Sequence, residues 1–494
     1  MAVQSVPVVS DASPLALPLG GGHLELDGTL EGRYVQRVHS STPREDPEGK
    51  LRLRAGADLA SRLRLESAVT AVAGGLPRDP RGAGVFDFDG TLQDLSPSLD
   101  VEEAHLSVYL RALDLRAGIQ KFAWGKLDAI QPNDLLNPEK FYDPILEDEN
   151  DRKVGIPALS ATVHVPPLPG DVAPENVQLS GVWAPIVVPF RFPDDDERWY
   201  PPLARVPSRS QANGFTVETQ ARLRDGDVPE RDLANGAGAA RLGGFFRGVD
   251  FSFYYYDGYD TQPSLDVDVR GFVTFNPLNP GCVPVGADPD CFDVRSEIDV
   301  FPVFQRVRAA GADFAYNLLG ATIRAEAAWV KNRLYARTIR EVVASQDVDT
   351  VGILLAPGQE QEVPVTITPV NVRRDGVEWG FGGDYLFFGT TFFLVQMNQT
   401  MVLDNDVDLL ISDTETRIAT TVRRSFLGDR LEAELIGYYG LQGVYGMAHP
   451  RLTYDLTDYV DLRIGYVLLA GHEESILGQY ERNDQGYVRV RLSF

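Results

Sequence analysis

The final segment of the chain, residues 485–494, constrains the fold more than any other stretch. Val488 and Val490 alternate there with Arg489 and Arg491. Successive side chains of a strand point to opposite faces, so this segment would have one apolar face and one arginine-bearing face. That pattern is unusual for a soluble sheet but suits the wall of a membrane barrel, with lipid outside and water inside. An ordinary edge strand at a chain end is the alternative.

The last residue of this strand is Phe494. An aromatic residue in that position resembles the assembly signal of bacterial outer-membrane β-barrels, and this resemblance implies recognition by the barrel-assembly machinery. The chain departs from the signal at one position. The signal often has a glycine five residues before the end, where this chain has Arg489.

The composition excludes several classes of protein. No apolar run approaches the roughly 18 residues of a membrane helix, so a chain of this kind that spans a membrane would do so with strands. The 46 glycines and 33 prolines fit many turns and argue against a helical bundle. The formal net charge of −25 argues against nucleic acid as a partner, because a phosphate-binding surface needs clustered basic residues.

Cys282 and Cys291 are the two cysteines, and they flank a stretch rich in glycine, proline and aspartate. This spacing predicts a small disulfide-closed loop, which would stabilise the protein by about 2–3 kcal/mol. A pair of free thiols is the alternative. The six histidines are scattered, and no P-loop, His-Glu-x-x-His or Gly-x-Ser-x-Gly motif is present. We therefore predict no enzyme activity, no cofactor and no metal site.

The beginning of the chain has no strand period over residues 1–22, which predicts a flexible lead-in. It also lacks the basic start and apolar core of a secretory signal, which an outer-membrane protein needs. We therefore take the sequence as the mature form with its signal peptide removed. Residues 23–494 are then expected to form a single barrel.

Alternating segments recur along this region at intervals typical of a barrel. The expected strands are a first segment from His23 to about Val35, a hairpin within 49–72, two strands within 101–124, and the segments 156–166, 177–189, 242–256, 264–276, 299–317, 320–336, 368–387, 390–403, 415–427, 430–441, 444–456, 459–470 and 485–494. A helix is the alternative for 101–124. Short connections alternate with long ones at about 71–100, 125–154, 191–240, 277–297 and 338–366.

This alternation of connection lengths predicts an all-β fold, a transmembrane antiparallel up-and-down β-barrel. Short turns would face the periplasm and long loops the outside. The count of segments allows 16 or 18 strands, and 18 agrees better with both chain ends lying in the periplasm.

The strand period also assigns side chains to the lumen. The predicted lumen residues are Arg306, Arg308, Arg324, Glu326, Arg417, Arg423, Glu432, Glu434, Arg463, Arg489 and Arg491. An arginine facing lipid near the midplane would cost about 2–4 kcal/mol, so a charged inner face should be hydrated and could conduct solutes. Alternatively, these charges pair across strands and stiffen a plugged barrel.

A short motif that runs from the end of a predicted strand into the long loop 125–154 carries a family resemblance. Its residues are Gly118, Gln120, Trp124, Gly125, Asp128, Asp134, Asn137 and Pro138, with a second element at Arg324-Ala-Glu326. The chain resembles a poorly characterised proteobacterial family of outer-membrane barrels, grouped loosely with porins and alginate-export channels. This resemblance implies an outer-membrane location and a transport role, with no defined substrate.

Two of the long loops could fold inward and narrow the lumen. The predicted constriction residues are Trp124, Asp128, Asp134, Asn137, Trp199 and Tyr200. We expect a channel for the passive passage of small polar or amphiphilic solutes, either monomeric or self-associating, in contact with outer-membrane lipid and lipopolysaccharide. A polysaccharide export barrel and a structural or adhesive barrel with a closed lumen are the alternatives.

Overall fold

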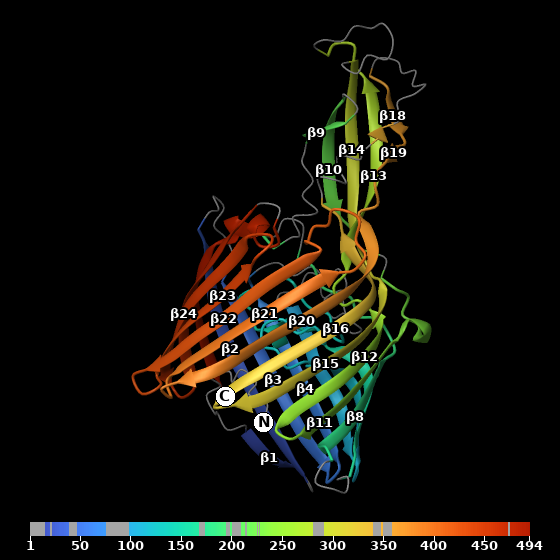
Figure 1. Ribbon diagram of the computed structural model, residues 1–494. Helices are drawn as coiled ribbons and strands as arrows, with labels where there is room; N and C mark the ends of the chain where they lie inside the picture. Colours follow the sequence, from blue (N-terminus) through green and yellow to red (C-terminus); the bar gives the residue numbers. More distant parts are fainter. Residues whose placement is uncertain are drawn as a thin grey trace.

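The structure is a computed structural model. It describes residues 15–19, 22–38, 47–75, 98–166, 173–193, 198–199, 209–212, 215–224, 226, 228–279, 291–338, 347–348, 358–472 and 475–494. Strands dominate these residues, and the main sheet has 19 of them. All of its strands except β1 (Leu15–Leu19) form a closed antiparallel barrel of 18, so the predicted fold class and the preferred strand count are confirmed (Figure 1).

The barrel strands follow one another around the wall in chain order. They are β2 (Gly22–Arg37), β3 (Glu48–Ala60), β4 (Leu63–Ala73), β5 (Ser98–Tyr109), β6 (Leu113–Gln120), β7 (Ile156–His164), β8 (Glu175–Ala184), β11 (Ala237–Phe246), β12 (Val249–Tyr259), β15 (Arg306–Leu318), β16 (Ala321–Ala336), β20 (Asn371–Phe387), β21 (Thr391–Val402), β22 (Thr414–Phe426), β23 (Leu431–Gly440), β24 (Tyr445–Thr457), β25 (Val460–Gly471) and β26 (Gln485–Ser493).

The seam between the first and last barrel strands closes the wall. Strand β2 pairs with β26 from Thr29 opposite Ser493 to Arg37 opposite Gln485. Strand β1 pairs with the beginning of β2 on the same edge as β26. Residues 15–19 were predicted to belong to a flexible lead-in, and they instead extend the sheet below the C-terminus, because β2 is longer than its pairing with β26.

Short and long connections alternate along the chain, as predicted. Arg247-Gly248 and Leu319-Gly320 each make a two-residue hairpin turn with positive φ at both positions. This is the backbone of a type I′ turn, whose twist matches that of the strands it joins. We call the barrel end that holds these turns the turn end. No helix among the described residues is long and apolar enough to cross a membrane.

The opposite end of the barrel carries a five-stranded sheet, which we call the arm (Figure 1). We call this end of the barrel the arm end. In sheet order the arm consists of β18 (Glu360–Val363), β13 (Ser264–Phe275), β14 (Phe292–Val303), β10 (Phe215–Leu223) and β9 (Arg209–Ala212). Its strands come from three consecutive long connections, and β10 and β14 pair in parallel. A small pair, β17 (Asp347–Val348) and β19 (Val365–Thr366), lies in the third connection.

The arm changes two of the expected strand assignments. Residues 264–276 form a strand, but it is β13 of the arm and no part of the barrel wall. The expected strand 299–317 is divided between the end of β14 and β15. Both differences have one cause: a sheet with one covered face has the same period of two as a membrane strand.

Candidate permeation site

The two faces of the barrel wall differ in the way the sequence predicts. On β26, Val488 and Val490 are 40% and 43% exposed. Tyr487 and Arg489, which alternate with these valines, are each 6% exposed. The same alternation places these predicted lumen residues on the inner face: Arg324, Glu326, Arg417, Arg423, Glu432, Glu434, Arg463, Arg489 and Arg491. Their part in permeation remains a prediction.

Arg306 and Arg308 lie on the opposite face from the one predicted. They share the outward positions of β15 with Phe314 and Tyr316, while Val307 and Ala309 point inward and are buried. The arginine side chains are 40% and 69% exposed and both pair with Asp257 on the outward face of β12. Near the beginning of β15 the inner face is apolar, because a loop packs against Val307 and Ala309, so polarity alone assigns this part of the strand to the wrong face.

That loop is the connection between β6 and β7, residues 121–155, which we call the inner loop. Its ends are tied together by Asn137. The Oδ1 of Asn137 accepts a hydrogen bond of 2.7 Å from the Phe122 amide, and its Nδ2 donates to the carbonyl oxygens of Gln120 and Val154 at 3.2 and 2.8 Å. One buried amide therefore satisfies both strand ends, which explains why an asparagine stands here.

The first part of the inner loop is held by Glu326, from the inner face of β16. The Glu326 carboxylate accepts hydrogen bonds from the backbone amides of Lys126 at 2.9 Å, Leu127 at 3.3 Å and Asn133 at 2.6 Å. Several amides converging on one buried carboxylate form an anion nest, here occupied by the protein's own side chain. The two motif elements singled out in the sequence, Trp124-Gly125 and Arg324-Ala-Glu326, thus meet in space.

Further contacts join the same part of the loop to neighbouring strands. Asp128 pairs with Arg324 at 3.0 Å, and its backbone amide donates to Gln396 Oε1 on β21 at 2.9 Å. The Lys126 ammonium pairs with Asp313 on β15 and donates to Ser252 Oγ on β12 at 3.1 Å. Lys126 and Gln396 could not be singled out from the sequence, because nothing in their local pattern distinguishes them from other polar strand or loop residues.

Trp124 adds an apolar contact between the inner loop and the barrel wall. Its ring centroid lies 5.6 Å from that of Tyr254, and both side chains are buried in the largest apolar cluster, together with Leu136, Val307 and Ala309. A cluster of this kind inside the barrel fixes the loop against the wall formed by β12, β15 and β16.

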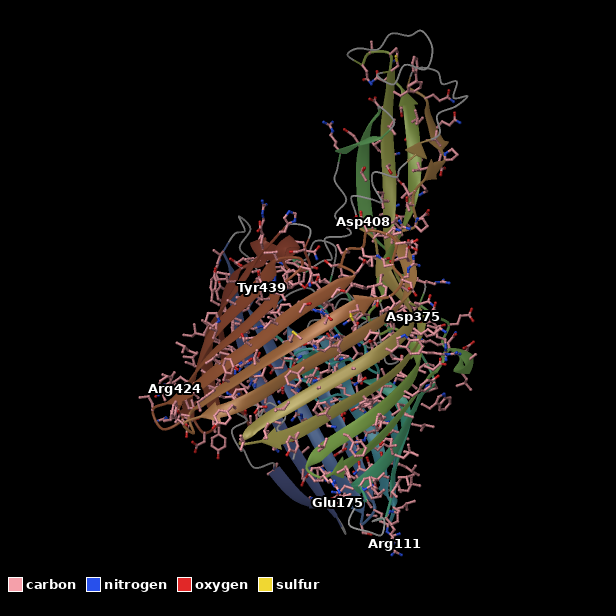
Figure 2. The ribbon with its side chains drawn as sticks, in the orientation of Figure 1. Arg111, Glu175, Asp375, Asp408, Arg424 and Tyr439 are labelled. Atoms are coloured by element: carbon pink, nitrogen blue, oxygen red, sulfur yellow. The ribbon has the colours of Figure 1, made fainter. Side chains whose placement is uncertain are left out.

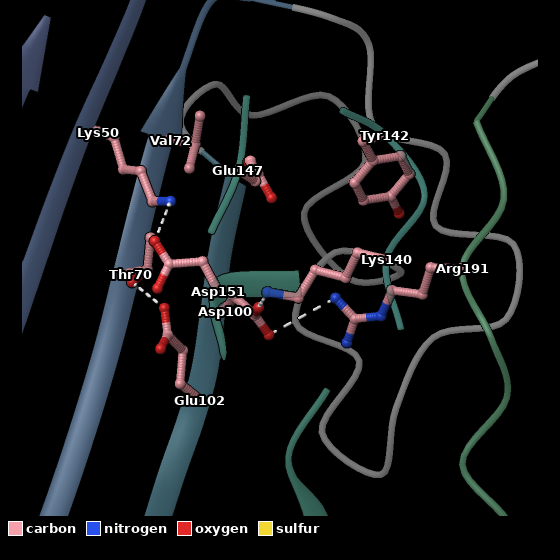
Figure 3. Close-up of a pocket in the computed structure, with 10 residues that line it drawn as sticks. All are labelled: Lys50, Thr70, Val72, Asp100, Glu102, Lys140, Tyr142, Glu147, Asp151 and Arg191. Atoms are coloured by element: carbon pink, nitrogen blue, oxygen red, sulfur yellow. Dashed lines mark hydrogen bonds and ion pairs between the residues drawn. The ribbon is translucent and has the colours of Figure 1, made fainter. Parts of the chain in front are cut away.

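The later part of the inner loop is acidic and faces the opposite, basic wall. Asp143 pairs with Arg33 of β2 at 3.3 Å. Asp151 pairs with Lys50 of β3 at 3.3 Å and with Arg52, as Figure 3 shows for Lys50. A cavity of about 20 Å³, room for one water, lies among these groups. The inner loop therefore reaches from one wall of the lumen to the other.

The remaining predicted constriction residues lie at different places. Asp134 is buried and pairs with Lys153, within the inner loop itself. Trp199 is 1% exposed and stacks on Tyr480 at 5.4 Å, in a cluster with Val467 and Leu469 of β25. Tyr200 and Cys282 lie outside the described residues, so the role of the first and the disulfide of the second with Cys291 remain predictions.

A row of arginines crosses the basic wall at mid-height. Arg33 of β2 stands opposite Arg489 of β26, which stands opposite Arg463 of β25. Arg33 pairs with Glu48 at 2.9 Å, and Arg489 with Asp461 at 3.5 Å. Among the residues that the structure describes, the side-chain partner of Arg463 is the Thr453 hydroxyl, at 3.0 Å. The carboxylates balance the charges of Arg33 and Arg489, so Arg463, which stands opposite the like charge of Arg489, is the member of the row that an anion would stabilise.

The Asp128 carboxyl group of the inner loop has a strongly raised pKa. Burial raises the pKa of Asp128 to about 6, against the opposing effect of the Arg324 charge, and the nearby Asp384 contributes to the rise. Loss of hydration disfavours the charged form of a carboxyl group. Within the described part of the chain, no group of three or more histidine, cysteine or acidic residues is arranged to hold a metal ion.

A closed barrel of 18 antiparallel strands, with an apolar outer face and a charged interior, has the architecture of bacterial outer-membrane porins and channels. No protein-family model matches the chain, and no curated protein matches it either.

Solved structures similar to this chain include three outer-membrane barrels. OccAB1 of Acinetobacter baumannii has 10% identity and a TM-score of 0.49, covering 95% of this chain and 96% of its own. The outer-membrane protein opdK of Pseudomonas aeruginosa has 10% identity and a TM-score of 0.46, covering 95% and 98%. OmpF of Salmonella typhi has 11% identity and a TM-score of 0.39, covering 97% and 100%. At these values the likeness carries no argument about function.

Proposed function

We propose that this protein is a bacterial outer-membrane channel through which small polar or amphiphilic solutes diffuse passively. The observation that carries the proposal is the division of the wall into two faces. Apolar side chains such as Val488 and Val490 point outward, while arginines and carboxylates line the interior on adjacent strands. A charged interior of this size needs water, because burying unpaired charges costs several kcal/mol per ion, on the order of 3–5 kcal/mol for a broken pair.

The inner loop supports a small solute rather than a large one. It is bound to Glu326 on one wall and to Arg33 and Lys50 on the other, so it narrows the lumen between them. Solutes would pass beside this loop and along the row of Arg33, Arg489 and Arg463. Because the described side-chain partner of Arg463 is an uncharged hydroxyl, we expect anionic solutes to be favoured over cations of the same size.

The alternatives fit the arrangement less well. A polysaccharide export barrel would be favoured by a continuous ladder of arginines along the lumen, whereas Arg33, Arg489 and Arg463 form a row of three across neighbouring strands. A structural barrel with a closed lumen would need the inner loop to fill the interior. Arg423 on the inner face keeps a side-chain exposure of 26%, which supports hydrated space beside the loop.

Three further parts of the proposal go beyond the fold. We infer that the chain belongs with the barrels that share the Trp124-Gly125 to Asn137-Pro138 motif. We also infer that it has no enzyme activity and that Phe494 is read by the barrel-assembly machinery. The contact between Gly125 and Glu326 supports the first inference, because it gives the motif a structural reason to exist in a channel.

Single-channel conductance of the purified protein in a planar bilayer tests the proposed function. We expect stable conductance steps and, in a salt gradient, a reversal potential that indicates anion preference. Well-folded protein that conducts no ions would contradict the channel and favour the closed-lumen barrel. Conductance that is blocked by long anionic oligosaccharides at low concentration would favour the export barrel instead.

A further inference from the structure

A group of charged residues stands on the outer face of the barrel, where apolar side chains are expected. We call it the rim patch. It lies at the arm end of four adjacent strands and consists of Asp257, Arg306, Arg308, Lys331, Arg373 and Asp375. Figure 2 shows Asp375 at the end of the barrel from which the arm rises. Four basic and two acidic residues give the patch a net charge of +2, in a chain of net charge −25.

The rim patch is particular to this sector of the wall. On the other barrel strands, among the residues that the structure describes, the three outward positions nearest the arm end are uncharged. β-Propensity alone would not confine charge to four neighbouring strands. A specific requirement of this sector is therefore a better explanation than chance variation of surface residues.

Arg308 is the centre of the patch. In the sheet register it stands directly opposite Asp257 on one side and Lys331 on the other. Asp257 Oδ2 accepts a hydrogen bond from Arg308 Nε at 2.9 Å, and Asp257 also pairs with Arg306 at 2.8 Å. One carboxylate is thus shared by two guanidinium groups. Lys331 and Arg308, both exposed, remain directly opposed like charges, which destabilise a sheet unless an anion lies between them.

The next outward row toward the turn end shows at which depth the patch lies. Tyr255 stands opposite Ala310, and Ala310 stands opposite Trp329. Tyr255 is 49% exposed and Trp329 44% exposed, so both rings face the surroundings of the barrel. Tyrosine and tryptophan mark the interface between hydrocarbon and headgroups in membrane barrels. The charged row lies one residue pair beyond these rings, at the level of the lipid headgroups.

We propose that the rim patch binds a phosphate group of the phosphorylated glycolipid in the outer leaflet. Arg308 and Lys331 would hold the phosphate between them, since guanidinium groups match phosphate oxygens in a forked geometry. The acyl chains would lie on Tyr255, Ala310 and Trp329. This proposal rests on the outer-membrane location proposed above, and it does not depend on whether the lumen conducts.

The test measures lipid retention by the full-length protein. The double variant Arg308→Gln, Lys331→Gln is compared with the wild type and with Arg424→Gln, Arg430→Gln, a control that removes the same charge near the turn end, where Figure 2 shows Arg424. Each protein is titrated in nanodiscs with bisphosphorylated lipid A, with dephosphorylated lipid A and with phosphatidylglycerol, and bound lipid is counted by native mass spectrometry.

We expect the first double variant to bind bisphosphorylated lipid A about tenfold more weakly than the wild type, and the control to bind like the wild type. Equal binding by all three proteins would overturn the site. Equal binding of dephosphorylated lipid A would overturn phosphate recognition, and equal binding of phosphatidylglycerol would overturn the choice of glycolipid. If the double variant fails to fold, the single variant Lys331→Gln provides the same comparison. Conductance measured on the same samples separates this result from the proposed channel function.

Discussion

Gly125 lies so close to Glu326 that a β-carbon at position 125 would come within 2.8 Å of the glutamate Oε2. The backbone of Gly125 has a φ of +116°, a region that side chains of L-amino acids rarely adopt. The close approach and the positive φ have the same cause. The chain must turn its amides toward the carboxylate at close range, so the residue before Lys126 can have no side chain.

We therefore expect Gly125→Ala to release the inner loop from β16. The clash removes buried hydrogen bonds to Glu326, at a cost of about 1–3 kcal/mol each, and the loop should fluctuate in the lumen. Single-channel recordings should show a larger and noisier conductance than in the wild type. Gly181→Ala is the matched control, because a β-carbon there meets nothing within 4 Å. Unchanged current noise in Gly125→Ala would contradict the role of this contact.

Neutralising the arginine row should change ion selectivity. Arg463→Gln removes the member of the row whose described side-chain partner is the uncharged Thr453. A charge at contact distance in water contributes about 1 kcal/mol, so anion occupancy beside the row should fall by up to about fivefold.

The measurement for this variant is the reversal potential in a salt gradient, which should move toward cation preference. The effect should shrink as the ionic strength rises, because salt screens the charge. Arg424→Gln on the outer face is the control and should leave the reversal potential unchanged. A shift of equal size in both variants would argue against the row as a selectivity element.

The raised pKa of Asp128 predicts a pH dependence of the channel. With a folded pKa of about 6 against an ordinary value of 3.8, the folded protein takes up a proton as the pH falls through 6, and the unfolded chain does so only near 4. This group therefore favours folding at low pH, and its contribution is lost as the pH rises through about 6.

Between pH 7.5 and pH 5, protonation of Asp128 removes a negative charge beside Arg324, so anion preference should increase. Reversal potentials measured across this range test the expectation. Asp128→Asn should reduce this change in selectivity, because it removes the titration of Asp128 and leaves that of Asp134, whose pKa burial raises to about 7. A wild-type channel with constant selectivity over this range would contradict the prediction.

The contact between β2 and the C-terminus indicates how replacing Phe494 should affect folding. The backbone amides of Gly28 and Phe494 donate to each other's carbonyl oxygens at 2.8 and 3.0 Å, and the Phe494 ring covers Gly28. Phe494→Ala should lose about 1–2 kcal/mol of apolar burial at the seam. We expect slower appearance of the heat-resistant folded form on gels. Phe426→Ala removes an outward aromatic residue at the same end and should fold at the wild-type rate.

Much of the barrel could be predicted because membrane strands alternate apolar and polar residues in the sequence. Alternation in β22, β23, β25 and β26 assigned the inner faces correctly. The count of 18 strands is confirmed, although the expected strand 242–256 is two strands, β11 and β12, joined by the turn at Arg247-Gly248, and the expected strand 264–276 belongs to the arm. The alternation of polar and apolar residues assigns the faces of a strand wrongly where protein, and not water, covers its inner face. On β15 the inner loop covers Val307 and Ala309, so the interior there is apolar and Arg306 and Arg308 point outward.

The contacts that hold the inner loop could not be predicted in the same way. Glu326 and Lys126 are far apart in sequence, and no local period relates a loop amide to a strand carboxylate. The motif around Trp124 and Gly125 indicated that the segment matters. The folded barrel shows that its partner is Glu326, because closing the sheet brings the inner face of β16 within reach of the loop that follows β6.

The arm joins three connections that are separate in the chain, since β10, β14 and β18 each come from a different one. Its central strand β14 has β13 on one side and the parallel strand β10 on the other. The arm sheet therefore cannot form one hairpin at a time as the chain is synthesised. The arm is complete once the three connections between β8 and β20 lie on the same side of the membrane, so a complete arm indicates that these six of the 18 barrel strands are in place.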